Sequence, residues 1–185
     1  YMRAPTPLDT PLDITSDQEP PRLMNDDKVI AEAVASDAMA LPDFPVPPSL
    51  EEARAASGSL PSAHPNCFCC GDRLEHGEGL RVHAGPLGPG RGDQVAGVWN
   101  VHPDHIGPDG FAPEEHVWAA IDCPGSYAWL ARDGGHGGLT AMMQAEVIER
   151  PTASEECIVL AWPIEQQSER RRTSGVALFG ADGRP

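Results

Sequence analysis

The feature that most constrains the fold of this chain is a helical segment over residues 113–130 that is apolar around most of its circumference. Pro113 followed by Glu114 and Glu115 is a typical helix start, because proline suits the first turn and acidic side chains complement the helix dipole. The apolar positions that follow are Val117, Trp118, Ala120, Ile121, Tyr127, Trp129 and Leu130. A helix without a polar face is buried on all sides. Pro124 predicts a kink or a second helical segment.

Segments with strand-like sequences flank this helix on both sides. They cover residues 80–84, 94–101, 139–149, 157–163 and 171–179. Their order along the chain is two strands, the helix and then three strands. Because the apolar helix lies in the middle of this order, the sequence predicts an α+β fold in which an antiparallel sheet wraps around one long central helix.

The composition of the chain excludes several classes of partner. The 185 residues are 40% hydrophobic, which is enough for a core, but the net charge is -15 and the isoelectric point is about 4.6. A nucleic-acid-binding protein needs a basic surface, and an anionic membrane repels an acidic chain. No apolar run approaches the length of a membrane span, and no signal peptide is visible. The odd number of cysteines indicates reduced thiols, so we expect a cytoplasmic protein.

Two parts of different character precede residue 64. Residues 1–16 are interrupted by prolines and predict at most an irregular or edge strand. Residues 22–34 predict a hairpin, with a helix over residues 30–39 as the alternative. Residues 41–48 form a linker stiffened by proline, and Ser49 then caps a short helix that is rich in alanine and glutamate.

Three motifs are more specific than these patterns. The first is Cys67-Phe68-Cys69-Cys70-Gly71, followed by Gly79-Leu80-Arg81-Val82. The second is the helical run Val117-Trp118-Ala119-Ala120-Ile121-Asp122-Cys123-Pro124-Gly125. The third is Arg170 to Arg172, followed by Gly175-Val176-Ala177-Leu178 and Ala181-Asp182-Gly183-Arg184. Together they resemble the hotdog-fold thioesterase superfamily, in its acyl-CoA thioesterase-like, actinobacterial-type branch. The resemblance covers roughly residues 48–185.

The resemblance implies a tandem double hotdog with an incomplete first half. Residues 1–40 would be remnant strands of a first hotdog unit, and residues 41–63 the proline-rich linker and short helix. Residues 64–185 would be the second hotdog domain without its last strand. Both ends of the chain are abrupt, so we expect the native protein to extend beyond them.

The resemblance also implies a function, the hydrolysis of acyl-CoA-type thioesters without a cofactor, by a protein that forms homo-oligomers. Thioesterases of this superfamily use a carboxylate on the central helix as a general base or a nucleophile, and Asp122 matches that position. A structural role, in which Asp122 caps a helix restart at Pro124, stays open. A different register would begin the helix at Leu139 with Glu146 as the acid, but the strand-like residues and proline that follow argue against it.

Other residues are weaker candidates. Thr140 matches a hydroxyl that holds the water in some tandem thioesterases, although threonine is also an ordinary strand residue. Arg170, Arg171 and Arg172 form the only basic cluster and either contact CoA phosphates or are a solvated charge run. The substrate-contact candidate Trp118 and its neighbours Tyr127 and Trp129 alternatively belong to a core or interface.

The cysteine-rich segment raises the question of a metal. Cys67, Cys69 and Cys70, with His64 and His83 nearby, suggest a zinc site. A second cysteine pair at the spacing of zinc ligands is absent, so we expect no metal. The alternative to an enzyme is a non-catalytic acyl-binding, CoA-binding or regulatory hotdog module.

Overall fold

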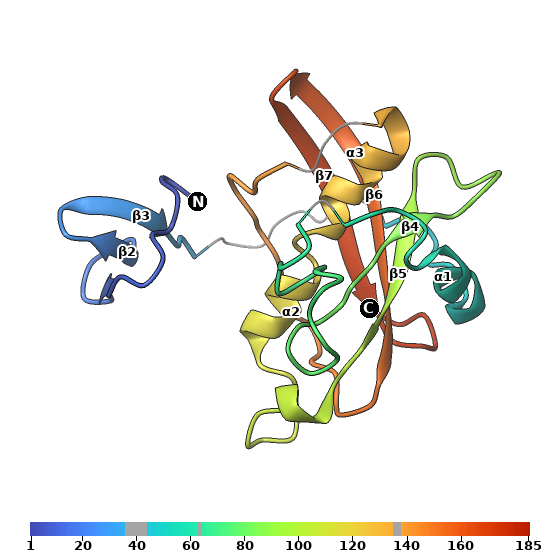
Figure 1. The fold of residues 1–185 in the computed structure, drawn as a ribbon, viewed down its shortest axis with the longest axis horizontal. Coiled ribbons are helices and arrows are strands. Elements are labelled where there is room, and N and C mark those ends of the chain that lie inside the picture. The colour runs from blue at the N-terminus through green and yellow to red at the C-terminus, as the bar shows by residue number, and fades with distance from the viewer. Residues whose placement is uncertain (36–43, 63, 135–137) are drawn as a thin grey trace. The chain divides into compact units, whose positions relative to one another are not determined.

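The computed structural model describes residues 1–35, 44–62, 64–134 and 138–185 (Figure 1). The chain forms two compact units: the smaller contains Tyr1–Leu41 and Leu139–Glu146, and the larger contains Pro42–Gly138 and Val147–Pro185. No helix in the described part of the chain is both long enough and apolar enough to cross a membrane.

The smaller unit contains a three-stranded antiparallel sheet. Its strands are β1 (Asp13–Thr15), β2 (Arg22–Asn25) and β3 (Lys28–Glu32), in the order β1-β2-β3. The predicted hairpin is therefore confirmed, and the alternative helix is wrong over its first residues, which belong to β3. The turn between β2 and β3 includes Asp26 with a φ of 51°. Aspartate tolerates this left-handed conformation better than most residues, which explains a tight turn at that point.

The larger unit contains a four-stranded antiparallel sheet. Its strands are β4 (Gly85–Pro86), β5 (Val95–Asn100), β6 (Glu156–Ser168) and β7 (Arg171–Phe179), in the order β4-β5-β6-β7. The three longer strands agree with the predicted segments 94–101, 157–163 and 171–179, although β6 continues to Ser168. The predicted α+β class with an antiparallel sheet is thus confirmed.

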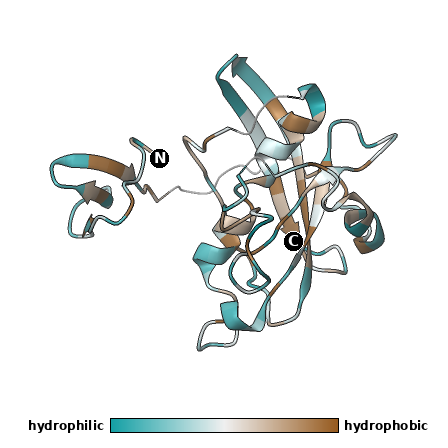
Figure 2. Cartoon of the chain, in the orientation of Figure 1, coloured by the Kyte–Doolittle hydropathy of each residue, from teal (hydrophilic) through white to brown (hydrophobic). Residues whose placement is uncertain are grey.

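Both faces of this sheet are buried, and the pleat divides the side chains between two clusters. Val95, Trp99, Cys157, Val159 and Ala161 belong to the cluster that also contains residues of the helices after β5. Ala96, Val98, Ile158, Leu160, Ala177 and Phe179 belong to a second cluster with Ala53. Successive side chains of a strand point to opposite faces of the sheet, so consecutive core residues of each strand belong to different clusters. Figure 2 shows the hydrophobic middle of the sheet and the hydrophilic far end of the β6–β7 hairpin.

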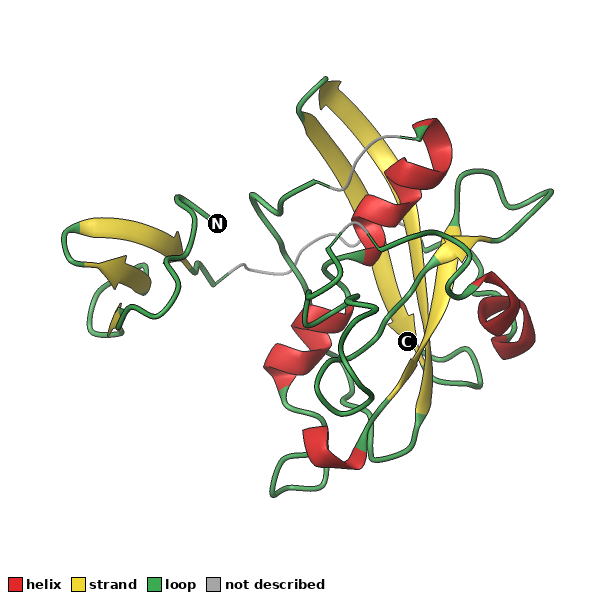
Figure 3. Ribbon diagram, in the orientation of Figure 1, coloured by secondary structure: helices red, strands yellow, loops and turns green. Residues whose placement is uncertain are grey.

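Helices pack against both faces (Figure 3). Helix α1 (Leu50–Ala56) contacts β5 and β6. Its predicted cap is confirmed, because Ser49 and Glu52 form a reciprocal capping box in which the Glu52 amide donates to Ser49 Oγ at 3.2 Å and the Ser49 amide donates to the Glu52 carboxylate at 2.7 Å. The opposite face is covered by α2 (Glu114–Ala120) and α3 (Pro124–Asp133), of which α3 contacts β4, β5, β6 and β7. A single 3₁₀ turn, η1 (Pro103–His105), lies between β5 and α2.

The central helix is not one continuous element. Helix α2 ends at Ala120, three residues form a turn, and α3 begins at Pro124. Proline has no amide hydrogen and its ring clashes with the preceding turn, so a helix cannot run through this position undisturbed. The structure therefore corrects the expected long central helix to two segments, the outcome that Pro124 itself indicates.

Two predicted strands are wrong. Residues 80–84 are largely buried but form no strand, because Arg81 has a φ of 56° and the amides of Leu80 and Val82 donate to the carbonyls of Phe68 and Cys69. Residues 139–149 form no strand either. The Ala141 carbonyl accepts a hydrogen bond from the Met2 amide, and the segment passes from the larger unit into the smaller one and back, so it does not run along one sheet.

The close approach of residues 83–84 to β5 makes Gly97 essential. A Cβ atom at Gly97 would lie 2.5 Å from the His83 carbonyl oxygen and 3.2 Å from Ala84 Cα, so the backbone would have to move. We expect Gly97→Ala to lower the free energy of unfolding by about 1–3 kcal/mol, measured by urea denaturation. Gly138→Ala is the control, since nothing lies within 4 Å of a Cβ there. Equal effects of the two substitutions would contradict this account.

Candidate functional site

Asp122 lies in the turn that separates α2 from α3. Its amide donates to the Ala119 carbonyl at 3.3 Å, and the residue is half-buried. The N-cap position of α3 is occupied by Cys123, one residue later. The candidate catalytic acid is therefore at the start of a helix rather than inside an unbroken one, where the helix dipole favours a negative charge.

A short chain of hydrogen bonds fixes the beginning of α3 against β7. Trp129 Nε1 donates to Ser174 Oγ at 3.0 Å, and Ser174 Oγ donates to the Gly125 carbonyl at 2.7 Å. A Cβ at Gly125 would lie 3.0 Å from Ser174 Cβ, so a glycine permits the helix to approach the strand. Trp129 and Tyr127 are buried, which supports their alternative role as core residues.

Three thiols meet at this same helix start. The Sγ atoms of Cys67, Cys70 and Cys123 all lie within 4.8 Å of one another, and those of Cys67 and Cys123 are 3.5 Å apart. Interaction with the Cys123 thiol, together with burial, raises the pKa of Cys70, and interaction with the Cys69 thiol raises the pKa of Cys123. The raised pKa keeps both thiols in the neutral form, which is a weak nucleophile.

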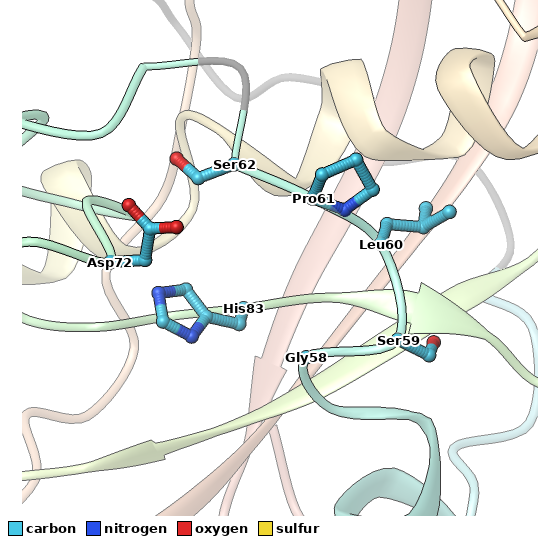
Figure 4. Close-up of a pocket in the computed structure, with 7 residues that line it drawn as sticks. All are labelled: Gly58, Ser59, Leu60, Pro61, Ser62, Asp72 and His83. Atoms are coloured by element: carbon cyan, nitrogen blue, oxygen red, sulfur yellow. The ribbon is translucent and has the colours of Figure 1, made fainter.

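A separate hollow lies beside the strand-like residues 81–84 (Figure 4). It is lined by Gly58, Ser59, Leu60, Pro61, Ser62, Asp72 and His83 and has a volume of about 190 Å³. Figure 4 shows Ser62, Asp72 and the ring of His83 gathered at one end. Ser62 Oγ and His83 Nε2 are buried without a hydrogen-bond partner in the described structure. A second hollow of about 320 Å³ shares Gly58 and His83 with the first.

Sequence reasoning missed this hollow. The sequence suggests a role for His83 only as a neighbour of the cysteines, and Ser62 and Asp72 come from irregular segments without a motif. Their approach depends on the turn at Gly58, whose amide donates to the His83 carbonyl at 3.2 Å. The left-handed φ of 72° at Gly58 is the one local signal that the chain reverses there.

The other predicted site residues belong to several elements of the chain. Thr140 and Glu146 are exposed residues of the smaller unit, and no helix begins at Leu139, so the alternative register is wrong. Trp118 is a half-buried residue of α2. His136 and Gly137, which precede that segment, lie outside the described residues.

The arginine cluster divides into two kinds of residue. Arg170 and Arg171 are exposed at the end of the β6–β7 hairpin. Arg172 forms an ion pair with Asp133, with an N–O distance of 2.8 Å, and its guanidinium lies over the Trp129 ring at 5.1 Å from the centroid. Arg172 is therefore engaged in the contact between α3 and β7, whereas its two neighbours are available to a ligand.

Two histidine rings lie beside Phe68, in the loop that contains Cys67, Cys69 and Cys70. Phe68 lies 5.8 Å from the His105 ring and 5.4 Å from the His116 ring, measured between centroids. His105 is buried, and its Nε2 atom lies 2.7 Å from the Gly77 carbonyl oxygen. Burial lowers the pKa of His105, so the ring is neutral at pH 7. These rings act as an aromatic support for the loop.

Comparisons with known proteins give little further information. No protein-family model matches the chain, and no curated protein matches it. Among solved structures, the crystal structure of a thioesterase superfamily protein matches with a TM-score of 0.48 and 16% sequence identity. The match covers 70% of this chain and 65% of that protein, so the chain spans less than two thirds of its length.

The different environments of the arginines lead to a direct test. We expect Arg172→Ala to lower the free energy of unfolding by about 1 kcal/mol, because it removes a partly buried ion pair and a cation–π contact. Arg170→Ala removes only an exposed side chain and leaves the stability unchanged. Urea denaturation of both variants measures the difference, and a loss of stability in Arg170→Ala as large as in Arg172→Ala would refute the distinction.

Proposed function

We propose that the larger unit hydrolyses acyl-CoA-type thioesters, with Asp122 as its catalytic carboxylate. The observation that carries the proposal is the helix break, because it sets an acidic side chain directly before the N-terminal end of α3. The motifs around Cys67 and Asp122 that resemble hotdog thioesterases support the same reaction. In this proposal the smaller unit is a remnant of a preceding hotdog unit, and the protein forms homo-oligomers.

The chemistry requires two groups at opposite ends of one carbonyl. A carboxylate activates water as a general base, or attacks the thioester carbon itself as a nucleophile. Partial positive charge at the start of a helix stabilises the oxyanion that develops on the carbonyl oxygen. A helix that restarts two residues after an aspartate offers both within one short segment.

The CoA part of such a substrate is strongly anionic, whereas this chain has a net charge of -15. A local cationic surface must therefore oppose the overall field of the protein. Arg170 and Arg171 are the proposed phosphate contacts, because both are exposed and neighbours in sequence. Arg172 is retained by Asp133 and contributes less. Trp118 stays a candidate for the acyl chain and Thr140 a candidate for holding water.

A second candidate function is binding without turnover. It is favoured by the hollow beside His83, whose described lining includes none of Asp122, Trp118 and the Arg170–Arg172 cluster. A module of this kind would bind an acyl or CoA ligand and be stabilised by it, without releasing thiol.

Thiol release from a panel of acyl-CoAs tests the proposed reaction. We expect the protein to release CoA and Asp122→Asn to lower kcat by about 100-fold or more, the usual contribution of a general base. Glu115→Gln is the matched control, since it removes an exposed carboxylate from the first turn of α2. Thr140→Ala belongs in the same series.

Three outcomes separate the candidates. Turnover that is unaffected by Asp122→Asn would move the catalytic acid elsewhere. A thermal shift with CoA or an acyl-CoA, in the absence of any thiol release, would favour the binding module. If the protein shows no turnover and no thermal shift, both candidate functions lose their support.

The arginine pair gives an independent prediction. We expect the double substitution Arg170→Ala with Arg171→Ala to raise KM for acyl-CoA several-fold and to leave kcat unchanged, because the phosphates are remote from the reacting carbonyl. For an acyl thioester that lacks the nucleotide part of CoA, we expect the same double variant to raise KM less. Arg73→Ala, another exposed arginine, is the control. An equal increase in KM for both thioesters would contradict phosphate binding.

A further inference from the structure

The three clustered thiols come from two segments that are remote in sequence. Cys67 and Cys70 belong to the loop before residue 80, and Cys123 belongs to the turn between α2 and α3. A zinc ion bound tetrahedrally by thiolates has Zn–S distances of about 2.3 Å, which places neighbouring sulfur atoms roughly 3.8 Å apart. The Cys67 and Cys123 Sγ atoms, 3.5 Å apart, are close to this spacing, and the other two pairs lie within 4.8 Å.

The loop is shaped so that two of its cysteines point the same way. The Gly71 amide donates to the Cys67 carbonyl at 2.7 Å, which closes a tight turn around the pair. A Cβ at Gly71 would lie 2.5 Å from the Cys67 carbonyl oxygen and 2.6 Å from that of Pro65, so only glycine fits. Cys69 has a different orientation, since its Sγ lies 3.9 Å from the Ala120 carbonyl oxygen. Two cysteines separated by two residues are a common zinc-binding unit.

A buried hydroxyl beside the cluster is a second, independent observation. Tyr127 is 3% exposed, and its hydroxyl has no hydrogen-bond partner in the described structure. The hydroxyl is close enough to interact with the Cys70 thiol. A neutral thiol is a weak acceptor, whereas a metal-bound thiolate accepts hydrogen bonds readily. The Tyr127 hydroxyl is therefore placed to donate to the sulfur of a metal-bound Cys70.

We propose that Cys67, Cys70 and Cys123 bind one zinc ion. Thiolate ligands select zinc or Cu(I) among the available metals, and iron–sulfur clusters are most often bound by four cysteines. Among the described residues, no further cysteine, histidine, aspartate or glutamate brings a donor atom within the same 4.8 Å. Water fills the fourth position, and the half-buried Cys67 and Cys123 leave one side of the cluster accessible to it.

The proposed zinc ligands differ from the set that the sequence suggests. The candidates Cys69, His64 and His83 are not ligands, and the ligand that completes the set is Cys123. The inference does not depend on thioester hydrolysis, because an ion at this position also joins the loop to the helix break as a structural link.

Metal binding by the full chain tests the proposal directly. We expect one equivalent of zinc per chain by elemental analysis after expression in zinc-supplemented medium. Titration of the metal-free, reduced protein with Co²⁺ should saturate at one equivalent and give thiolate-to-cobalt charge-transfer absorption with the strong visible bands of tetrahedral cobalt. Absence of these bands in the unaltered chain overturns the proposal whether or not any variant folds.

Cysteine variants identify the ligands. We expect Cys67→Ser, Cys70→Ser and Cys123→Ser each to weaken Co²⁺ binding by more than about 100-fold, beyond the effect of losing an outer-shell partner. Cys69→Ser and Cys157→Ser are the matched controls and should bind normally, with circular dichroism verifying the fold of all five variants. Tyr127→Phe should weaken binding about 10–100-fold while leaving the number of sites unchanged.

Two other results would overturn the zinc site. One is metal binding that survives Cys123→Ser while the variant stays folded, since the loop alone would then hold the ion. The other is a Cys67–Cys123 disulfide in protein purified without reductant, found by mass spectrometry together with less than a tenth of an equivalent of zinc.

Discussion

The larger unit depends on burying both faces of β6 at once. Val159 and Ala161 point toward α2 and α3, whereas Ile158 and Leu160 point toward α1. A shift of one residue in the pairing would send every one of these side chains to the wrong face, so the register of the sheet is determined by its two clusters. Because β5 and β7 pair with β6 on either side, their register follows from the same requirement.

The helix break determines where polar chemistry can occur within this apolar arrangement. An unbroken helix would bury Asp122 among aliphatic side chains, at a considerable cost in free energy. The restart at Pro124 instead gives the chain a turn in which a carboxylate and a thiol can sit half-buried at consecutive positions. Asp122 then directly precedes the start of α3, and the Cys123 thiol meets the loop that contains Cys67 and Cys70.

Local patterns predicted much of the fold, and long-range proximity explains what they missed. Ser49 with Glu52, the hairpin of the smaller unit and β7 all depend on residues close in sequence. The strand expected over residues 80–84 failed because the left-handed Arg81 interrupts it, and nothing in the alternation of apolar residues reveals that φ. Likewise, the approach of Cys123 to a loop more than fifty residues earlier, and that of Asp72 to His83, follow from the folded chain and not from any spacing.

The position of β7 at the edge of its sheet has a consequence for what the strand can pair with. β7 is the last strand of its sheet, so the backbone groups on its outer side have no ladder partner among the described strands. Such an edge is a template on which another molecule can add a strand. The exposed Arg171 occupies its first position, and a charged side chain on an edge strand discourages pairing edge to edge. Any segment that adds a strand to β7 in register must therefore either begin beyond this cation or bring an acidic side chain to meet it.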